Sequence, residues 1–259
     1  MSNVISLSAR AFREATSIPT GLNYACKWGL FRNLLRSSSH VGLKPMEDIY
    51  DKVLRKRFRV PVFFKEETGS TSADAIKMLK AGENPPFVVL ARMQSAAYGK
   101  MGSHWVGNVV GNLYLSHALA KTQQLGRHPD LLVRHVATKI CDVLGANFSI
   151  NAWVKLPNDV FVASKKVGGL LLEIARNGDS VAAAVLGIGI NVLVAPAIGN
   201  AGYLAACLQD FSADGLDFAD VAIAVVESSL DAISSFYLAK AHEGKEKKEV
   251  DGKMVRNFF

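Results

Sequence analysis

Residues 155–173 read KLPNDVFVASKKVGGLLLE and hold two apolar runs joined by a short polar segment. The first run, residues 160–162, is β-branched and aromatic. The second, residues 167–174, ends before the turn signals at residues 176–178. Short runs of this kind bounded by turn residues are typical of paired strands, so the stretch predicts a hairpin.

Four polar side chains stand around these runs: Lys155, Asn158, Asp159 and Lys166. Buried polar groups are costly unless they are paired, and a bound ligand would pair them. The glycines at 168–169 would let a ligand approach the backbone closely, and cations beside glycines suit a phosphate or a carboxylate. A surface hairpin with a lysine-capped turn is the alternative that these residues leave open.

The chain has 259 residues, of which 49% are hydrophobic, enough for one domain with a full core. No apolar run approaches the ~20 residues that cross a bilayer, so we expect no transmembrane helix and no membrane partner. Cys26, Cys141 and Cys207 lie far apart among apolar neighbours, which predicts buried thiols in a reducing compartment. The sequence contains neither a CxxC nor an HExxH motif, so nothing in it indicates a structural metal site, and we assign no metal ligands.

The net charge of +7 belongs to the first 60 residues, which hold 11 Lys+Arg and 4 Asp+Glu. The rest of the chain is neutral and shows no basic stripe with interleaved aromatics, so no nucleic-acid partner is expected. Residues 1–45 are rich in Arg and Ser and contain a single acid, Glu14. That composition is typical of an organellar transit peptide, with an extended arm as the alternative; we therefore expect a cytoplasmic or mitochondrial protein.

Hydroxyl residues 70–72 precede an expected helix at 73–81, where they are either helix caps or part of an anion site. Residues 93–107, MQSAAYGKMGSHWVG, form a glycine-punctuated loop typical of a mobile flap over phosphates. This loop has neither the P-loop nor the GxGxxG spacing. Asn191, polar in an apolar run, is either an edge residue or a ligand contact.

Hydrophobic periodicity predicts several further elements. Together they indicate an α+β fold, a mixed β-sheet flanked by helices, with the ligand between sheet and flap. The expected strands are residues 60–64, 87–91, 113–119 and 181–194, and the expected helices are residues 129–144 and 218–238.

These motifs, taken in order, resemble the catalytic domain of biotin protein ligases, also called holocarboxylase synthetases. The resemblance implies a class II synthetase-like biotin/lipoate ligase fold over residues 61–238, after a basic extension (1–60) and before a charged tail (239–259). With 21 residues left after Leu238, the family's small C-terminal SH3-like domain is expected to be missing. The matching blocks are Ser70-Thr71, Gln94 to Trp105, residues 112–116, residues 155–159, residues 166–173 and residues 187–191.

The resemblance implies an ATP-dependent ligase. Biotin and Mg²⁺-ATP give biotinyl-5′-AMP and pyrophosphate, and biotin then passes to a lysine of the biotin carrier domain of a carboxylase. A homodimer is a further expectation. The catalytic residues implied are Lys166, Asp159 and Lys100; the biotin-binding residues are Ser70, Thr71, Gln94, Tyr98, Lys100, Lys166, Gly169 and Leu171; the ATP-binding residues are Lys100, Trp105, Asn158, Lys166 and Asn191.

Two departures from the family pattern affect the site. Ala97-Tyr98-Gly99-Lys100 stands where the family usually has GRGR or GKGR, and Leu156 replaces the tryptophan of KWPND. Lysine lacks the planar fork with which arginine grips phosphate, so we expect weaker retention of the adenylate. The alternatives are a lipoate or octanoate ligase, which Gln94 and the KLPND motif disfavour, and a non-catalytic biotin-binding paralogue.

Overall fold

The computed structural model describes residues 48–120, 125, 129–177, 180–197 and 203–256. The predicted transit peptide, and with it Cys26, lies outside the described residues. The helices are α3 (Asp51–Arg55), α4 (Thr71–Lys80), α6 (Pro129–Phe148) and α7 (Phe218–Arg256), with the 3₁₀ turns η1 (Lys100–Gly102) and η2 (Leu208–Phe211). The strands are β1 (Val62–Thr68), β2 (Phe87–Gln94), β3 (Leu113–Ala118), β4 (Ala152–Lys155), β5 (Asp159–Val162), β6 (Lys165–Asn177), β7 (Ser180–Ile190) and β8 (Leu204–Ala205).

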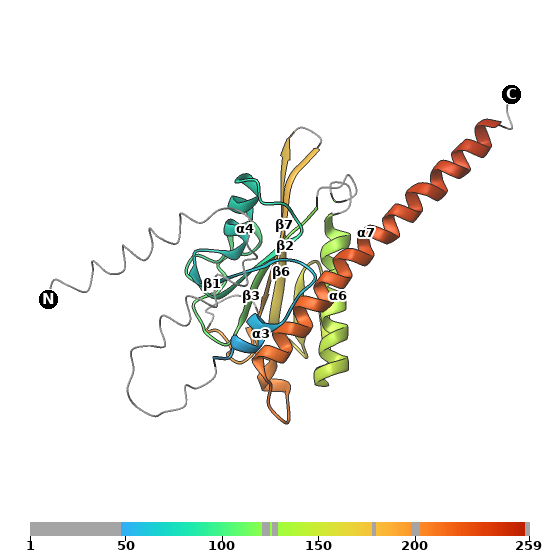
Figure 1. The fold of residues 1–259 in the computed structure, drawn as a ribbon. Helices are drawn as coiled ribbons and strands as arrows, with labels where there is room; N and C mark the ends of the chain where they lie inside the picture. The colour runs from blue at the N-terminus through green and yellow to red at the C-terminus, as the bar shows by residue number, and fades with distance from the viewer. Residues whose placement is uncertain (1–47, 121–124, 126–128, 178–179, 198–202, 257–259) are drawn as a thin grey trace, which may run out of the picture. The chain divides into compact units, whose positions relative to one another are not determined.

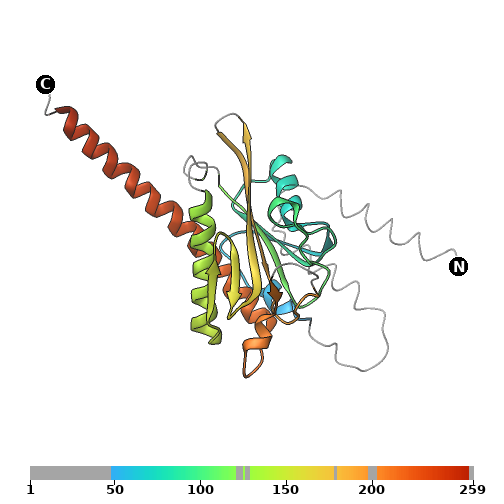
Figure 2. The same ribbon diagram turned by 180° about the vertical axis from the view of Figure 1, so that it is seen from behind.

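The strands form one mixed sheet in the order β1-β2-β3-β7-β6-β5-β4, with β8 beside β6. The β1–β2 and β6–β8 pairs are parallel, and the other pairs are antiparallel. Helices α6 and α7 lie against one face of the sheet and α4 against the other (Figures 1 and 2). The predicted α+β class, a mixed sheet flanked by helices, is confirmed.

The main core lies between the sheet and helices α6 and α7. Leu113 and Leu115 of β3 and Val136 and Ile140 of α6 belong to one cluster of buried apolar side chains. Burying an aliphatic side chain contributes about 1.5–3 kcal/mol, which is why apolar periodicity places these elements. A smaller cluster between the other face and α4 is organised around Phe87.

Helix α3 joins this core from a segment that we assigned to the N-terminal extension. Tyr50 is completely buried, with its ring 5.3 Å from that of Phe64 and 4.7 Å from that of Phe218. The adjacent Val53 is buried as well. Residues 48–60 are therefore part of the folded unit that also contains the predicted catalytic domain.

Helix α7 begins at Phe218, where we expected it, and its backbone continues to Arg256 rather than ending at Leu238. Its first part, Phe218–Leu238, is long and apolar enough to cross a membrane, with a mean hydropathy of 1.4. The expectation that no such segment exists is therefore wrong. Half of this segment is buried inside the fold, and the core helix of a globular domain meets the same criteria.

Cys141 and Cys207, the two cysteines among the described residues, are free and buried. Burial raises the pKa of the Cys141 thiol to about 11. A protonated thiol is a poor nucleophile. The prediction that these two cysteines are buried thiols is confirmed.

His117 on β3 ties the sheet to α7. Its ring is buried, and Nε2 lies 2.8 Å from the Ser229 hydroxyl on the helix. Burial lowers the pKa of His117 to about 3. The imidazole of His117 therefore binds a proton more tightly in the unfolded chain than in the folded one. The stability that this difference contributes is fully present above the unfolded pKa of about 6.5 and is lost as the pH falls toward 3.

We expect the free energy of unfolding to fall by as much as about 1.4 kcal/mol per pH unit below pH 6.5 because of His117. Urea unfolding at several pH values between 4.5 and 7.5 measures this slope. His117→Gln keeps a hydrogen-bonding side chain that does not titrate, so its slope should be shallower. Identical slopes in the two proteins would contradict the assignment.

Candidate active site

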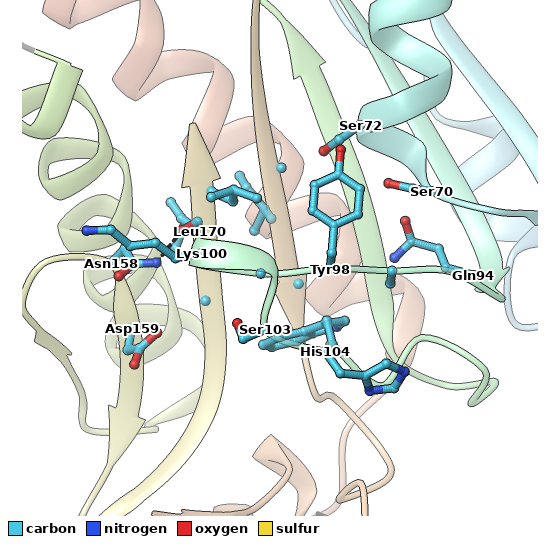
Figure 3. Close-up of a pocket in the computed structure, with 18 of the residues that line it drawn as sticks. Ser70, Ser72, Gln94, Tyr98, Lys100, Ser103, His104, Asn158, Asp159 and Leu170 are labelled. Atoms are coloured by element: carbon cyan, nitrogen blue, oxygen red, sulfur yellow. Dashed lines mark hydrogen bonds between the residues drawn. The ribbon is translucent and has the colours of Figure 1, made fainter. Parts of the chain in front are cut away.

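A cavity of about 440 Å³ lies between the glycine loop after β2 and the face of the sheet that α6 and α7 leave uncovered. Its wall comes from α4, β2, the loop, and strands β5, β6 and β7. Figure 3 shows a polar division: Ser70, Ser72 and Gln94 lie on one side, and Lys100, Asn158 and Asp159 on the other. The cavity thus has an uncharged end of hydroxyl and amide groups and a charged end.

At the uncharged end, α4 begins. The Ser70 hydroxyl accepts a hydrogen bond of 3.4 Å from the amide of Ala73, as a helix cap does. Ser70 also lines the cavity. The capping interpretation is therefore confirmed, and it is compatible with a ligand contact.

A buried network fixes the other polar groups of this end. Oε1 of Gln94 accepts hydrogen bonds from the Thr71 amide at 2.7 Å and the Thr71 hydroxyl at 3.1 Å. The hydroxyls of Thr71 and Ser72 both lie within 3.0 Å of the Ser116 hydroxyl on β3. Because Oε1 of Gln94 is occupied, its amide nitrogen is the group that remains to donate. This end is preorganised for a ligand with several donors and acceptors.

At the charged end, Lys166 at the start of β6 pairs with Asp159 on β5. Nζ of Lys166 lies 2.7 Å from Oδ1 of Asp159, and the lysine side chain is only 13% exposed. Two aromatic rings also face the ammonium: Tyr203 at 4.8 Å and Trp105 at 5.6 Å from Nζ to the ring centre. Tyr203 was not predicted from sequence, because only the pairing of β8 with β6 brings it to the cavity.

The indole of Trp105 packs against strands β6 and β7. A Cβ atom on Gly189 would come within 2.6 Å of this ring, and one on Gly169 within 3.5 Å. These glycines are paired across β6 and β7, and together they make room for the tryptophan. The indole nitrogen is buried and has no hydrogen-bond partner among the described residues. A donor in this state is suited to a ligand.

The loop is also held at Tyr98. The Tyr98 hydroxyl donates to the Glu173 carboxylate on β6, with oxygen distances of 2.9 and 3.1 Å. Burial, followed by the bond to Glu173, raises the pKa of Tyr98 to about 12. The phenol therefore stays protonated and donates a neutral hydrogen bond that connects the flap to the sheet.

Eleven of the twelve predicted site residues line the cavity; the exception is Asn191. Its amide nitrogen donates to the carbonyl of Ala206 at 3.0 Å, so this group holds backbone. Asn158 lines the cavity, but its amide nitrogen is bonded to the Leu170 carbonyl at 2.7 Å. The described lining also includes Ser72, Ser103, His104 and Leu170, which lie in segments that the sequence indicated but were not assigned as site residues, and Tyr203, which the sequence did not indicate.

Carboxylates are scarce at this site. No group of three or more His, Cys, Asp or Glu side chains that could hold a metal ion occurs within the described ranges. Asp159 is the one carboxylate of the described cavity lining, and it is paired with Lys166. Since Mg²⁺ is usually bound through one or two carboxylates plus substrate phosphates, the residues fit an ion that enters with a nucleotide.

Residues 66–191 match the model of the biotin/lipoate A/B protein ligase family, and this range contains every predicted site residue. Over these residues the chain is similar to biotin/lipoate protein ligases. The biotin--[acetyl-CoA-carboxylase] ligase of Paracoccus denitrificans is 38% identical over 140 residues, which are 51% of this chain and 55% of that protein. The chain spans about half or less of the length of the first curated relatives that it matches.

Solved biotin protein ligases share this fold. Biotin protein ligase from Leishmania major in complex with biotinyl-5-AMP superposes with a TM-score of 0.55 at 26% identity, covering 68% of this chain and 75% of that one. The Aquifex aeolicus biotin protein ligase in complex with biotin and ATP gives a TM-score of 0.58 at 23% identity, over 69% and 72% of the two chains, which supports the fold.

Proposed function

We propose that this protein is an ATP-dependent biotin protein ligase. The observation that carries the proposal is the polarity of the cavity: a buried hydroxyl and amide network at one end and the Lys166–Asp159 pair at the other. Biotin has the same polarity, with a ureido ring at one end and a carboxylate at the other. The wall between them is apolar at Leu170 and Leu171, which suits an alkyl tail.

In the first step, the biotin carboxylate attacks the α-phosphate of ATP and pyrophosphate leaves. Two anions must meet in this reaction, so fixed positive charge at the meeting point lowers the barrier. Lys166 supplies that charge from β6, and Lys100 supplies a second cation from the flap. Mg²⁺ would arrive with the ATP phosphates, whose charge it offsets.

In the second step, the amine of an acceptor lysine attacks the mixed anhydride and AMP leaves. Asp159 stands beside Lys166 at the charged end, where it can orient the incoming amine and accept its proton. The mixed anhydride also hydrolyses in water, so the covering loop that carries Trp105 protects it. The acceptor that we propose is the biotin carrier domain of a carboxylase.

A lipoate ligase is the competing function on the same fold. Its substrate ends in an apolar dithiolane ring, which would leave the buried amide nitrogen of Gln94 without a partner, since Oε1 is already bonded to Thr71. A site built to hydrogen-bond a polar substrate rejects an analogue that lacks those groups by several orders of magnitude. The uncharged end therefore favours biotin.

Gln94→Leu is expected to raise KM for biotin by about tenfold, since one hydrogen bond to the ureido ring is lost and apolar surface replaces it. The value of kcat should change little, because Gln94 lies at the opposite end of the cavity from the reacting carboxylate. Steady-state kinetics at saturating ATP measure both constants, and the melting temperature shows whether the variant is folded. An unchanged KM in a folded variant would place the ureido ring elsewhere.

The proposal is tested by pyrophosphate release from purified protein with Mg²⁺-ATP and either biotin or lipoate. Biotin-dependent release, followed by transfer of labelled biotin to a carrier domain, is the expected result. Release with lipoate alone would replace the proposal with its competitor. Biotin binding by calorimetry without any release, in the presence of a carrier domain, would indicate the non-catalytic paralogue.

A further inference from the structure

Strand β8 is a two-residue strand with a defined position beside the reacting end of the cavity. Leu204 and Ala205 pair in parallel with Lys165 and Lys166 of β6. The amide of Ala206 then donates to the carbonyl of Lys166 at 3.0 Å. The backbone of Lys166 is therefore held from the side of β8, at the point where its side chain enters the cavity.

The residue before this strand, Tyr203, meets the side chain of Lys166. Its ring centre lies 4.8 Å from Nζ, within the range of a cation–π contact. Nζ also lies 2.7 Å from the carboxylate of Asp159 and, farther away, 5.6 Å from the ring centre of Trp105. A carboxylate neutralises the ammonium, whereas an aromatic face attracts it and leaves its charge in place. Of the two rings, that of Tyr203 is the nearer, and it can hold Nζ for an incoming anion.

Asn191 fastens β8 from the other side. Its side-chain amide nitrogen donates to the Ala206 carbonyl at 3.0 Å, and its backbone carbonyl accepts from the Leu208 amide at 2.8 Å. Its backbone amide donates to the Val167 carbonyl on β6 at 2.7 Å. One buried residue therefore connects β6 with the segment that carries Tyr203, which explains a polar side chain at the end of an apolar strand.

We propose that Tyr203 is a positioning residue that aims the ammonium of Lys166 during adenylate formation, and that Asn191 acts at one remove by anchoring β8. This inference rests on the proposed ligase function, because it assigns roles within that reaction. It replaces the expectation that Asn191 contacts the nucleotide. Tyr203 does not need its hydroxyl for this role, only its ring.

Tyr203→Leu is expected to lower kcat for biotin-dependent pyrophosphate release by about three- to thirtyfold, the range of a partly desolvated cation–π contact. KM for ATP and biotin should stay close to the wild-type values. Tyr203→Phe restores the ring and should restore most of kcat. The matched control is Leu204→Ser, a substitution on the next side chain, which is 66% exposed and outside the cavity lining.

A rise in KM for ATP with an unchanged kcat in Tyr203→Leu would overturn the proposal, because it would show a contact with the nucleotide instead. Asn191→Ala should lower kcat in the same way, and the double variant with Tyr203→Leu should be no slower than the slower single variant. Additive losses would mean that Asn191 does not act through Tyr203.

A second measurement does not depend on ligase activity, so it separates this inference from the proposed function. Acetic anhydride labels lysine amines, and mass spectrometry of a digest gives the rate at Lys166, with Lys165 as the internal reference. Loss of the ring in Tyr203→Leu should raise the rate at Lys166 about threefold or more, while Tyr203→Phe should not. Equal labelling in all three proteins would overturn the inference even if the enzyme is active.

Discussion

Lys166→Ala is expected to lower biotin-dependent pyrophosphate release by about two to three orders of magnitude, the usual cost of removing one preorganised group that stabilises transition-state charge. Lys166 and Lys100 are the two lysines of the described cavity lining, and Lys166 is the better fixed of them. Its carboxylate partner and two aromatic rings hold it, and its side chain is nearly buried. Lys100 lies on an exposed turn of the flap.

The chain offers a matched control in Lys165, the preceding residue on the same strand, which is outside the described cavity lining. Lys165→Ala removes the same charge from nearly the same place and should change the rate by no more than about twofold. Lys166→Arg should keep partial activity, since it retains the charge in a larger group. Equal losses in Lys165→Ala and Lys166→Ala would mean that general electrostatics, rather than one aimed ammonium, supports the reaction.

Strands and helices with strong periodicity were predictable from the sequence. Strands β2 and β3 and the starts of α6 and α7 lie where the apolar pattern placed them, because each buries a continuous stripe. The short elements α3, β4 and β8 were not predictable. They contain two to five residues, and their stability comes from partners distant in the sequence, such as β6 for β8. The local sequence pattern does not indicate such distant partners.

The site residues that belong to recognisable sequence motifs were predictable. The KLPND and KKVGG segments fold into adjacent strands, so Asp159 and Lys166 meet as their spacing suggested. Tyr203 was missed because an isolated aromatic residue carries no motif. Asn191 was assigned a nucleotide contact by resemblance, whereas its amide nitrogen is bonded to the carbonyl of Ala206, the residue after β8. A polar residue in an apolar run indicates a hydrogen bond without revealing its partner; in Asn191 the amide nitrogen makes one, and the side-chain oxygen has no partner among the described residues.

Retention of the adenylate is expected to improve at one loop position and not at the other. Lys100→Arg should slow dissociation of biotinyl-5′-AMP by about ten- to hundredfold, because a guanidinium can bind the phosphate with two charge-assisted hydrogen bonds where the ammonium makes a point contact. Lys100 lies at the charged end of the cavity, on the same side as Asn158 and Asp159 in Figure 3, where the phosphate of the adenylate would sit.

Tyr98→Arg should have a much smaller effect, although it restores the other cation of the family's usual loop. The Tyr98 hydroxyl is bonded to Glu173, and an arginine at this position would pair with that carboxylate instead of the ligand. Release of labelled adenylate from preloaded enzyme measures both rates. Tyr98→Arg combined with Glu173→Gln frees the new guanidinium and should then slow release further. If Tyr98→Arg alone slows adenylate release as much as Lys100→Arg does, the new arginine is not paired with Glu173. The proposed pairing with Glu173 would then not explain why tyrosine can replace the family's arginine at residue 98.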